Sequence, residues 1–193
     1  MNIYDFDGTI YNGDSTRRFY FFCVKKYPFL LKFIPNQLWG MILYIFGRIS
    51  KEIFKEYFFS FLEGIKDPLK EVDVFWELES SRIKQWYLKI KNKDDLIISA
   101  SPEFILKIIC DKLDILPPIA SLVDYKTGKY IGLNCKGKEK VKRLKERCSQ
   151  IEVENVYSDS KTDIPLFKIA QNCYLVKKEK IIPYKFNVNK LKY

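Results

Sequence analysis

MNIYDFDGT, residues 1–9, joins a short apolar strand to two carboxylates, Asp5 and Asp7, at the carboxyl end of that strand. Residues i and i+2 of a strand share a face, and the turn at Gly8 and Thr9 allows both carboxylates to converge on one ion or substrate. Taken alone, such a pair is more often a polar exit from a strand into a loop than a catalytic pair. The choice between a solvated turn and a catalytic pair therefore depends on the rest of the chain.

The composition of the 193-residue chain is that of a globular protein, with 47% hydrophobic and 30% charged residues. This length suffices for one packed domain with an insertion. The chain contains no histidine, which excludes Ser-His-Asp and Cys-His catalysis and His-ligated zinc. Acid-base chemistry must therefore use Asp, Glu, Lys, Tyr or Cys side chains.

Five scattered cysteines without a CxxC pair favour neither a disulfide framework nor a cysteine-only zinc site. They suit a reducing compartment, and the first residues lack the basic and then apolar pattern of a signal peptide. We therefore expect a cytoplasmic protein. The net charge of +10 indicates either an anionic partner or lysines on solvated helix faces. No nucleic-acid-binding motif is recognisable, so no nucleic-acid partner is expected.

Short apolar runs and helical spacing alternate over the second half of the chain. The runs typical of buried parallel strands are residues 95–99, 153–157 and 173–176. Apolar spacing predicts helices over residues 102–113, 138–148 and 163–170. Residues 119–123 and 130–133 have the pattern of a hairpin. The alternation predicts an α/β fold with a doubly wound parallel sheet, in which ligands bind beyond the carboxyl ends of the strands.

A long aromatic-rich stretch after the first strand interrupts this alternation. Its expected helices are residues 17–26, 37–46, 51–64 and 69–89. An all-helical insertion at this point would form a cap over the active edge of the sheet. We therefore expect a core of residues 1–14 and 88–193 and a helical cap of residues 15–87.

The apolar density of the insertion raises the question of a membrane. Its longest uncharged run, residues 33–47, has 15 residues, whereas a spanning helix needs about 20. The flanking cations Lys25, Lys26, Lys32 and Arg48 suit an interfacial hairpin in peripheral contact with an anionic membrane. A cap that buries its aromatic side chains against neighbouring helices is the alternative, and both interpretations stay open.

A second acidic pair lies late in the chain. Asp159 and Asp163 follow the predicted strand 153–157, and parallel strands open on one edge, so this pair should lie near Asp5 and Asp7. Carboxylates gathered in this way repel one another unless a cation is present. An oxygen-only ligand set without His or clustered Cys indicates Mg²⁺.

A hydroxyl and a lysine complete the expected polar groups at this edge. Ser99 ends the predicted strand 95–99 and is followed by Ala100 and a helix start, where backbone N–H groups can hold a phosphate. A plain helix N-cap explains the same residues. The basic segment CKGKEKVKRL, residues 135–144, offers several lysines to balance the charge. Lys140 is our first choice because it precedes an apolar residue, and Lys138 is the second.

In this order, DFDGT, a hydroxyl that ends a strand, a lysine that opens a helix, and DSxxD after a strand resemble the four motifs of the haloacid dehalogenase-like (HAD) hydrolase superfamily. The motif residues Asp5, Ser99, Lys140 and Asp159 are separated by 94, 41 and 19 residues. The long first gap resembles the helical-cap, phosphoserine phosphatase-like subfamily (IB). The resemblance implies a Rossmann-like core.

The same resemblance implies a Mg²⁺-dependent phosphatase that hydrolyses a phosphomonoester through an aspartyl-phosphate on Asp5. Asp7 would protonate the leaving alcohol and then act as the base for water, roles that suit a metal-bound carboxylate and a neighbouring proton carrier. The implied Mg²⁺ ligands are Asp5, Asp7 through its carbonyl, and Asp159, with Asp163 supporting the ion's shell. Ser99 and Lys140 would bind the phosphoryl group, together with Gly8, Thr9 and Ala100.

The resemblance leaves the substrate open between a lipid phosphate and a small phosphorylated metabolite. The apolar insertion and the stretches NCKGKEKV and YSDSKTDIPL are similar to a phosphatidylglycerophosphatase-like branch. Phosphoserine phosphatases typically carry Glu where this chain has Asp14. The alternative is a non-catalytic protein of the same fold that binds an anionic partner, either a membrane or a nucleic acid. The sequence does not indicate the oligomeric state.

Overall fold

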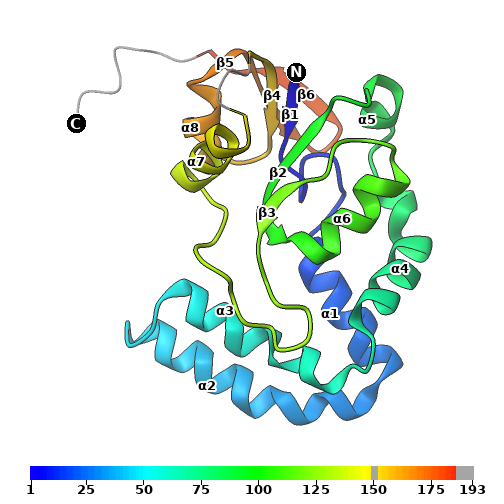
Figure 1. Ribbon diagram of the computed structural model, residues 1–193, viewed down its shortest axis with the longest axis vertical. Helices are drawn as coiled ribbons and strands as arrows, with labels where there is room; N and C mark the ends of the chain where they lie inside the picture. Colours follow the sequence, from blue (N-terminus) through cyan, green and yellow to red (C-terminus); the bar gives the residue numbers. More distant parts are fainter. Residues whose placement is uncertain (149–151, 186–193) are drawn as a thin grey trace.

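The computed structural model describes residues 1–148 and 152–185 and is built around one six-stranded sheet (Figure 1). The strand order is β3-β2-β1-β4-β5-β6, and all neighbouring strands are parallel except β5 and β6 at the edge. The strands are β1 (Asn2–Tyr4), β2 (Leu96–Pro102), β3 (Ile119–Ser121), β4 (Val153–Ser158), β5 (Ala170–Lys177) and β6 (Lys180–Pro183).

Helices cover both faces of this sheet, because side chains alternate along each strand and both faces are apolar. Tyr4 of β1 belongs to one buried cluster and Ile3 to the other. The helices that follow β2 and β3 are α6 (Glu103–Lys112) and α7 (Lys138–Arg147), and the 3₁₀ turn η4 (Lys161–Asp163) and α8 (Ile164–Phe167) follow β4. The predicted α/β fold with a doubly wound, mainly parallel sheet is confirmed.

Between β1 and β2 the chain forms helices and 3₁₀ turns. They are α1 (Ser15–Lys26), η1 (Pro28–Phe33), α2 (Ile34–Ile45), α3 (Lys51–Phe59), η2 (Ser60–Gly64), α4 (Pro68–Glu79), η3 (Ser80–Arg82) and α5 (Gln85–Ile90). Helix α4 packs on α6, where the Trp76 indole donates a hydrogen bond to the Ile105 carbonyl at 2.7 Å. Helices α2 and α3 pack together as a hairpin beyond the carboxyl ends of the strands (Figure 1).

The single helix predicted over residues 69–89 is wrong, because the chain breaks between α4 and α5. Ile83 and Lys84 are extended, and Lys84 N–H donates to the Ile10 carbonyl at 2.8 Å. Ile83 also forms an antiparallel bridge with Tyr11. Pairing with the loop that follows β1 therefore overrides the helical preference of this stretch.

The predicted hairpin 119–123 and 130–133 is present but shorter than expected, with backbone hydrogen bonds from Asp124 N–H to the Lys129 carbonyl and from Ile131 N–H to the Leu122 carbonyl. Residues Ile119–Ser121 join the main sheet as β3, parallel to β2, and the antiparallel part is reduced to a bridge between Val123 and Tyr130. The first residues of this apolar stretch therefore belong to the main sheet, and only the residues after them pair in the hairpin. The edge strand β6, which pairs antiparallel with β5, was not predicted.

Candidate active site

A tight turn after β1 positions the first acidic pair. Asp5 N–H donates to the Tyr157 carbonyl at 2.9 Å, and the N–H groups of the next turn, from Thr9 to Tyr11, all point at the Phe6 carbonyl. Gly8 has φ +74°, a left-handed conformation that glycine adopts without strain. A Cβ at this position would overlap the Asp159 carboxylate, so the glycine also allows β4 to approach.

Lys140 lies between two carboxylates at the edge of the sheet. Its Nζ donates to Asp5 Oδ1 at 2.9 Å and to Asp163 Oδ2 at 2.8 Å, and Lys140 is only 2% exposed. Burial opposes the charged amine, but the two carboxylates raise the pKa of Lys140 above its ordinary value, so it stays protonated. Lys138, the other lysine considered, is exposed.

Asp7 faces a different set of partners from Asp5. Its Oδ1 accepts from Ser15 N–H at 2.7 Å and its Oδ2 from the Ser101 hydroxyl at 2.5 Å. Burial raises the pKa of Asp7 to about 7, against the opposing effect of these hydrogen bonds. Burial also raises the pKa of Asp5 to about 6, and Lys140 limits that rise. Asp7 is therefore the carboxyl of the pair better suited to hold a proton near neutral pH.

A cavity of about 200 Å³ brings together six of the residues predicted from the sequence. They are Asp5, Asp7, Ser99, Ala100, Lys140 and Asp163. The remaining three form an adjacent group outside this lining, in which Asp159 N–H donates to the Thr9 hydroxyl at 2.8 Å and the Asp159 carboxylate packs against Gly8.

Sequence reasoning missed several other residues that line this cavity. They are Lys51, Lys55, Ser101, Asn134, Lys136, Ser160 and Thr162. Ser101 stands two residues after Ser99, so the strand spacing could have indicated that both hydroxyls share a face. Asn134 and Lys136 come from the loop before α7. Nothing local in the sequence brings that loop to the carboxylates.

Lys55 reaches this cavity from the α2–α3 hairpin. Its Nζ donates to Asn134 Oδ1 at 2.9 Å and to the Ala100 carbonyl at 3.3 Å. Burial, helped by the nearby charge of Lys51, lowers the pKa of Lys55 to about 8. The feature of the sequence that could have indicated Lys55 is that it is the one cation within the aromatic-rich stretch 53–62.

The carboxylates at this edge have the chemistry of a site for a hard cation. Burial raises the pKa of Asp159, and the charge of Asp163 adds to that rise. Asp163 Oδ1 is buried without a hydrogen-bond partner among the described residues. Mutual repulsion and an unpaired buried oxygen fit Mg²⁺. In residues 1–148 and 152–185 no three Asp, Glu, His or Cys side chains form a closed ligand group, so the fit rests on the donor chemistry.

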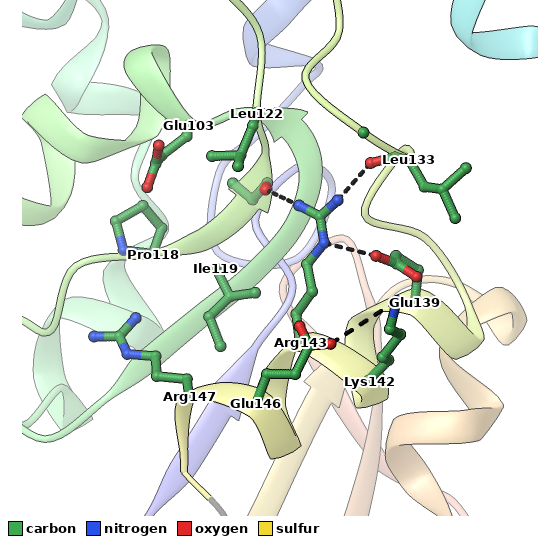
Figure 2. Close-up of a pocket in the computed structure, with 12 residues that line it drawn as sticks. Glu103, Pro118, Ile119, Leu122, Leu133, Glu139, Lys142, Arg143, Glu146 and Arg147 are labelled. Atoms are coloured by element: carbon green, nitrogen blue, oxygen red, sulfur yellow. Dashed lines mark hydrogen bonds and ion pairs between the residues drawn. The ribbon is translucent and has the colours of Figure 1, made fainter.

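A larger hollow, of about 530 Å³, lies between β3 and α7 and shares no lining residue with the cavity at Asp5 and Asp7 (Figure 2). Its centre is the Arg143 guanidinium, which donates to the Ala120 carbonyl at 2.7 Å, to Glu139 Oε1 at 2.9 Å and to the Leu133 carbonyl. These hydrogen bonds tie α7, which carries Lys140, to β3 and to the preceding loop. We therefore assign this hollow a structural role.

The fold and these side chains define an α/β protein whose candidate site is built from carboxylates, hydroxyls and lysines. The family model of the haloacid dehalogenase-like hydrolases matches residues 3–168, and the chain belongs to this family. This finding confirms the resemblance stated from the four motifs, and it makes the protein a hydrolase by family. No match was found among curated proteins.

Solved structures share this fold at low sequence identity. A protein of unknown function from Bordetella pertussis Tohama I has TM-score 0.71 and 17% identity, covering 90% of this chain and 87% of its own. A phosphoserine phosphohydrolase-like protein from Francisella tularensis has TM-score 0.52 and 19% identity, with 90% and 86% covered. A phosphoserine phosphatase described as a phospho-aspartyl intermediate analogue has TM-score 0.52 and 19% identity, with 89% and 83% covered.

Proposed function

We propose that the protein is a Mg²⁺-dependent phosphatase that hydrolyses a phosphomonoester through a covalent intermediate on Asp5. The observation that carries this proposal is the position of Lys140 between Asp5 and Asp163, beside a second carboxyl, Asp7, with a raised pKa. Membership of the hydrolase family and the fold shared with phosphoserine phosphatases support the proposal.

Asp5 and Asp7, the two carboxyls of DFDGT, have different roles in the proposed reaction. The ionised Asp5 carboxylate attacks phosphorus, and the bond to the leaving oxygen breaks as that oxygen takes the proton of Asp7. Water then attacks the phosphorus of the aspartyl-phosphate and gives a proton to Asp7. The bond between phosphorus and the Asp5 oxygen breaks, so phosphate leaves, Asp5 is again ionised and Asp7 is again protonated. Because Asp7 binds Ser15 N–H and the Ser101 hydroxyl, its side chain is held at the cavity in both steps.

The remaining residues of the cavity bind and orient the phosphoryl group. Lys140 and Ser99 line the cavity with a cation and a hydroxyl, and Ala100 of β2 contributes backbone. Asp5, the Asp7 carbonyl, Asp159 and Asp163 would hold Mg²⁺, which supplies charge neutralisation at the phosphoryl oxygens when bound. Gly8 and Thr9 shape the turn and hold Asp159 beside Asp5.

The cavity lining supports a substrate with a phosphate and a further polar or anionic group. Lys51, Lys55 and Lys136 add positive charge around it, and Lys55 comes from the segment that we propose as the cap, residues 15–87. A small phosphorylated metabolite and the headgroup of a lipid phosphate both fit this description. The five cysteines are free thiols, which supports the proposed cytoplasmic location.

Hydrolysis of an aryl phosphate with Mg²⁺ and with EDTA tests the proposal. We expect activity that requires Mg²⁺ and falls on the order of 10⁵-fold in Asp5→Asn, because the nucleophile is lost. The matched control is Asp114→Asn, an exposed carboxylate paired with Lys93 after α6. Wild-type activity in Asp5→Asn would remove Asp5 as nucleophile, and tight binding of an anionic partner without turnover would favour the non-catalytic alternative.

A substrate panel separates the two proposed substrate classes. Phosphoserine and phosphatidylglycerophosphate represent a soluble metabolite and a lipid phosphate, each measured as kcat/KM with Mg²⁺. A preference of about 100-fold for either one, equivalent to roughly 2.7 kcal/mol of transition-state stabilisation, would assign the class.

A further inference from the structure

Helix α2 has apolar side chains on nearly its whole circumference, yet most of them are exposed. The stretch from Phe33 to Gly47 contains no charged residue. In a water-soluble protein a helix that is apolar all round is normally buried. Here the exposed fraction is 55% at Trp39, 71% at Ile45 and 73% at Phe46. This helix therefore has an apolar face that the described residues do not cover.

One side of α2 is already occupied by α3. Gly40 is buried and lies so close to α3 that a Cβ there would overlap the Tyr57 ring. Gln37 donates to the Phe58 carbonyl at 2.9 Å, and the Tyr44 ring stacks on Phe54 at a centroid distance of 5.0 Å. Positions 37, 40 and 44 follow helical spacing, so they form the inner side of α2.

The opposite side of α2 is what we call the outer face. Its residues, spaced i, i+1, i+4, i+7 and i+8 along the helix, are Leu38, Trp39, Ile42, Ile45 and Phe46, and all five are exposed. The preceding turn η1 adds two exposed apolar residues, Phe29 and Leu31. Large side chains gathered in this way mark an interaction surface rather than scattered surface residues.

Within residues 15–51, the segment that contains η1 and α2, all the charged side chains are positive. Residues 15–51 contain no Asp or Glu, and their seven cations are Arg17, Arg18, Lys25, Lys26, Lys32, Arg48 and Lys51. Arg18 and Lys26 pair with Glu79 and Glu71, whereas the other five have no ion pair within the described residues. Lys32 lies over the rings of Phe29 and Phe33, at 5.7 and 5.1 Å. The partner of this surface must therefore accept both apolar side chains and positive charge.

The length of α2 limits how it can meet a lipid bilayer. At about 1.5 Å per residue, a 12-residue helix is about 18 Å long, short of the ~30 Å apolar thickness of a bilayer. Within the part of the chain that the structure describes, no helix is long and apolar enough to cross a membrane. A short helix with an exposed apolar face and flanking cations can instead lie in the plane of the interface.

We propose that η1 and α2 dock on an anionic phospholipid surface, with the outer face of α2 at the boundary of headgroups and acyl chains. Lys25, Lys32 and Arg48 then meet lipid phosphates. A second copy of this chain fits less well, because it would bring the same cations together, and a nucleic acid offers no apolar layer. The proposal does not depend on catalysis, so it stands or falls separately from the proposed phosphatase activity.

Sedimentation with vesicles in EDTA tests this docking without turnover. We expect binding to vesicles of equal parts phosphatidylglycerol and phosphatidylcholine, weakened by salt, and little binding to phosphatidylcholine alone. Trp39 is an internal probe, because Trp76 is buried and the Trp86 indole N–H is inaccessible to solvent. Its emission should shift to the blue on binding, and Trp39→Phe should remove that shift.

Two matched pairs of variants separate the apolar and the charged contributions. The triple variant Trp39→Ser, Ile42→Ser, Phe46→Ser should weaken binding by about 100-fold or more, whereas Leu78→Ser, an exposed leucine of α4, should not. Lys32→Gln with Arg48→Gln should weaken it by about 25-fold, or roughly five-fold per cation, whereas the exposed Lys145→Gln should have little effect.

Thermal unfolding of each variant establishes that it is folded before its binding is interpreted. The absence of binding to anionic vesicles at low salt would overturn the proposal. Undiminished binding by the folded triple variant would also overturn it. So would a dimer in solution that the triple variant abolishes, because the outer face would then be covered by a second copy of the chain.

Discussion

Folded proteins normally bury apolar side chains and expose charged ones, and the acidic edge of the sheet and the outer face of α2 depart from this pattern in opposite ways. At the edge, Lys140, Asp5 and Asp163 are charged and largely withdrawn from water, and each has a partner of opposite sign. On α2, large apolar side chains face water, and no described residue covers them. Burying charge and exposing apolar surface both cost free energy. The ion pairs of the edge are therefore formed within the chain, whereas the apolar side chains of the outer face have no cover among the described residues.

The largest expected effect tests whether the edge depends on its buried cation. Lys140→Met should lower the free energy of unfolding by about 3–5 kcal/mol at pH 8 without Mg²⁺, because Asp5 and Asp163 would lose their counter-charge. Urea unfolding measures the change. Lys138→Met, an exposed lysine two residues away, is the matched control and should change stability by less than about 0.5 kcal/mol. The reverse ranking would mean that the wrong lysine has been assigned to the edge.

The second effect concerns pH. Burial raises the pKa of Asp5 to about 6 and of Asp7 to about 7, so these two carboxyls bind more protons in the folded protein than in the unfolded chain between about pH 4 and 7. Their contribution to the free energy of unfolding therefore falls as pH rises through that window. In EDTA, we expect Asp7→Asn to remove on the order of 2–3 kcal/mol of that fall, measured by urea unfolding at pH 5 and 8.

Asp114→Asn is the control for this pH experiment. Lys93 lowers the pKa of Asp114, so this carboxyl stays ionised from pH 5 to 8 and its loss should leave the slope unchanged. A steeper slope in Asp7→Asn than in the wild type would contradict the raised pKa of Asp7.

The smallest effects compare the two sides of α2. Gly40→Ala should cost about 1–3 kcal/mol, because its Cβ would overlap the Tyr57 ring. Phe46→Ser, on the outer face, should change stability by no more than about 0.5 kcal/mol, because the ring contributes little to the folded core. Thermal unfolding of the two variants side by side checks this. A large loss of stability in Phe46→Ser would mean that the outer face is structural.

The sequence was most informative where the chemistry is local. The strands that lead into Asp5 and Asp159, and the strand that carries Ser99, could be recognised because a buried parallel strand is a short apolar run. Lys140 could be preferred over Lys138 from the sequence because Lys140 directly precedes an apolar residue in the predicted helix. The α/β class followed from the same alternation of runs and helices.

The sequence was least informative where distant segments meet. The break at Ile83 and Lys84 depends on pairing with the loop after β1, and the position of Lys55 depends on how α3 packs above Ala100. Composition indicated that the insertion was rich in apolar residues. It could not indicate which of them α3 covers, because that choice depends on the close approach at Gly40.

The close approach at Gly40 packs α2 tightly against α3. The outer face lies on α2, and Lys55 reaches the cavity from α3. If α2 and α3 move together, a displacement of α2 also displaces Lys55. If surface binding changes the affinity of the cavity for its ligand by some factor, thermodynamic linkage requires the ligand to change the affinity for the surface by the same factor. Gly40 would then set how strongly these two binding events communicate.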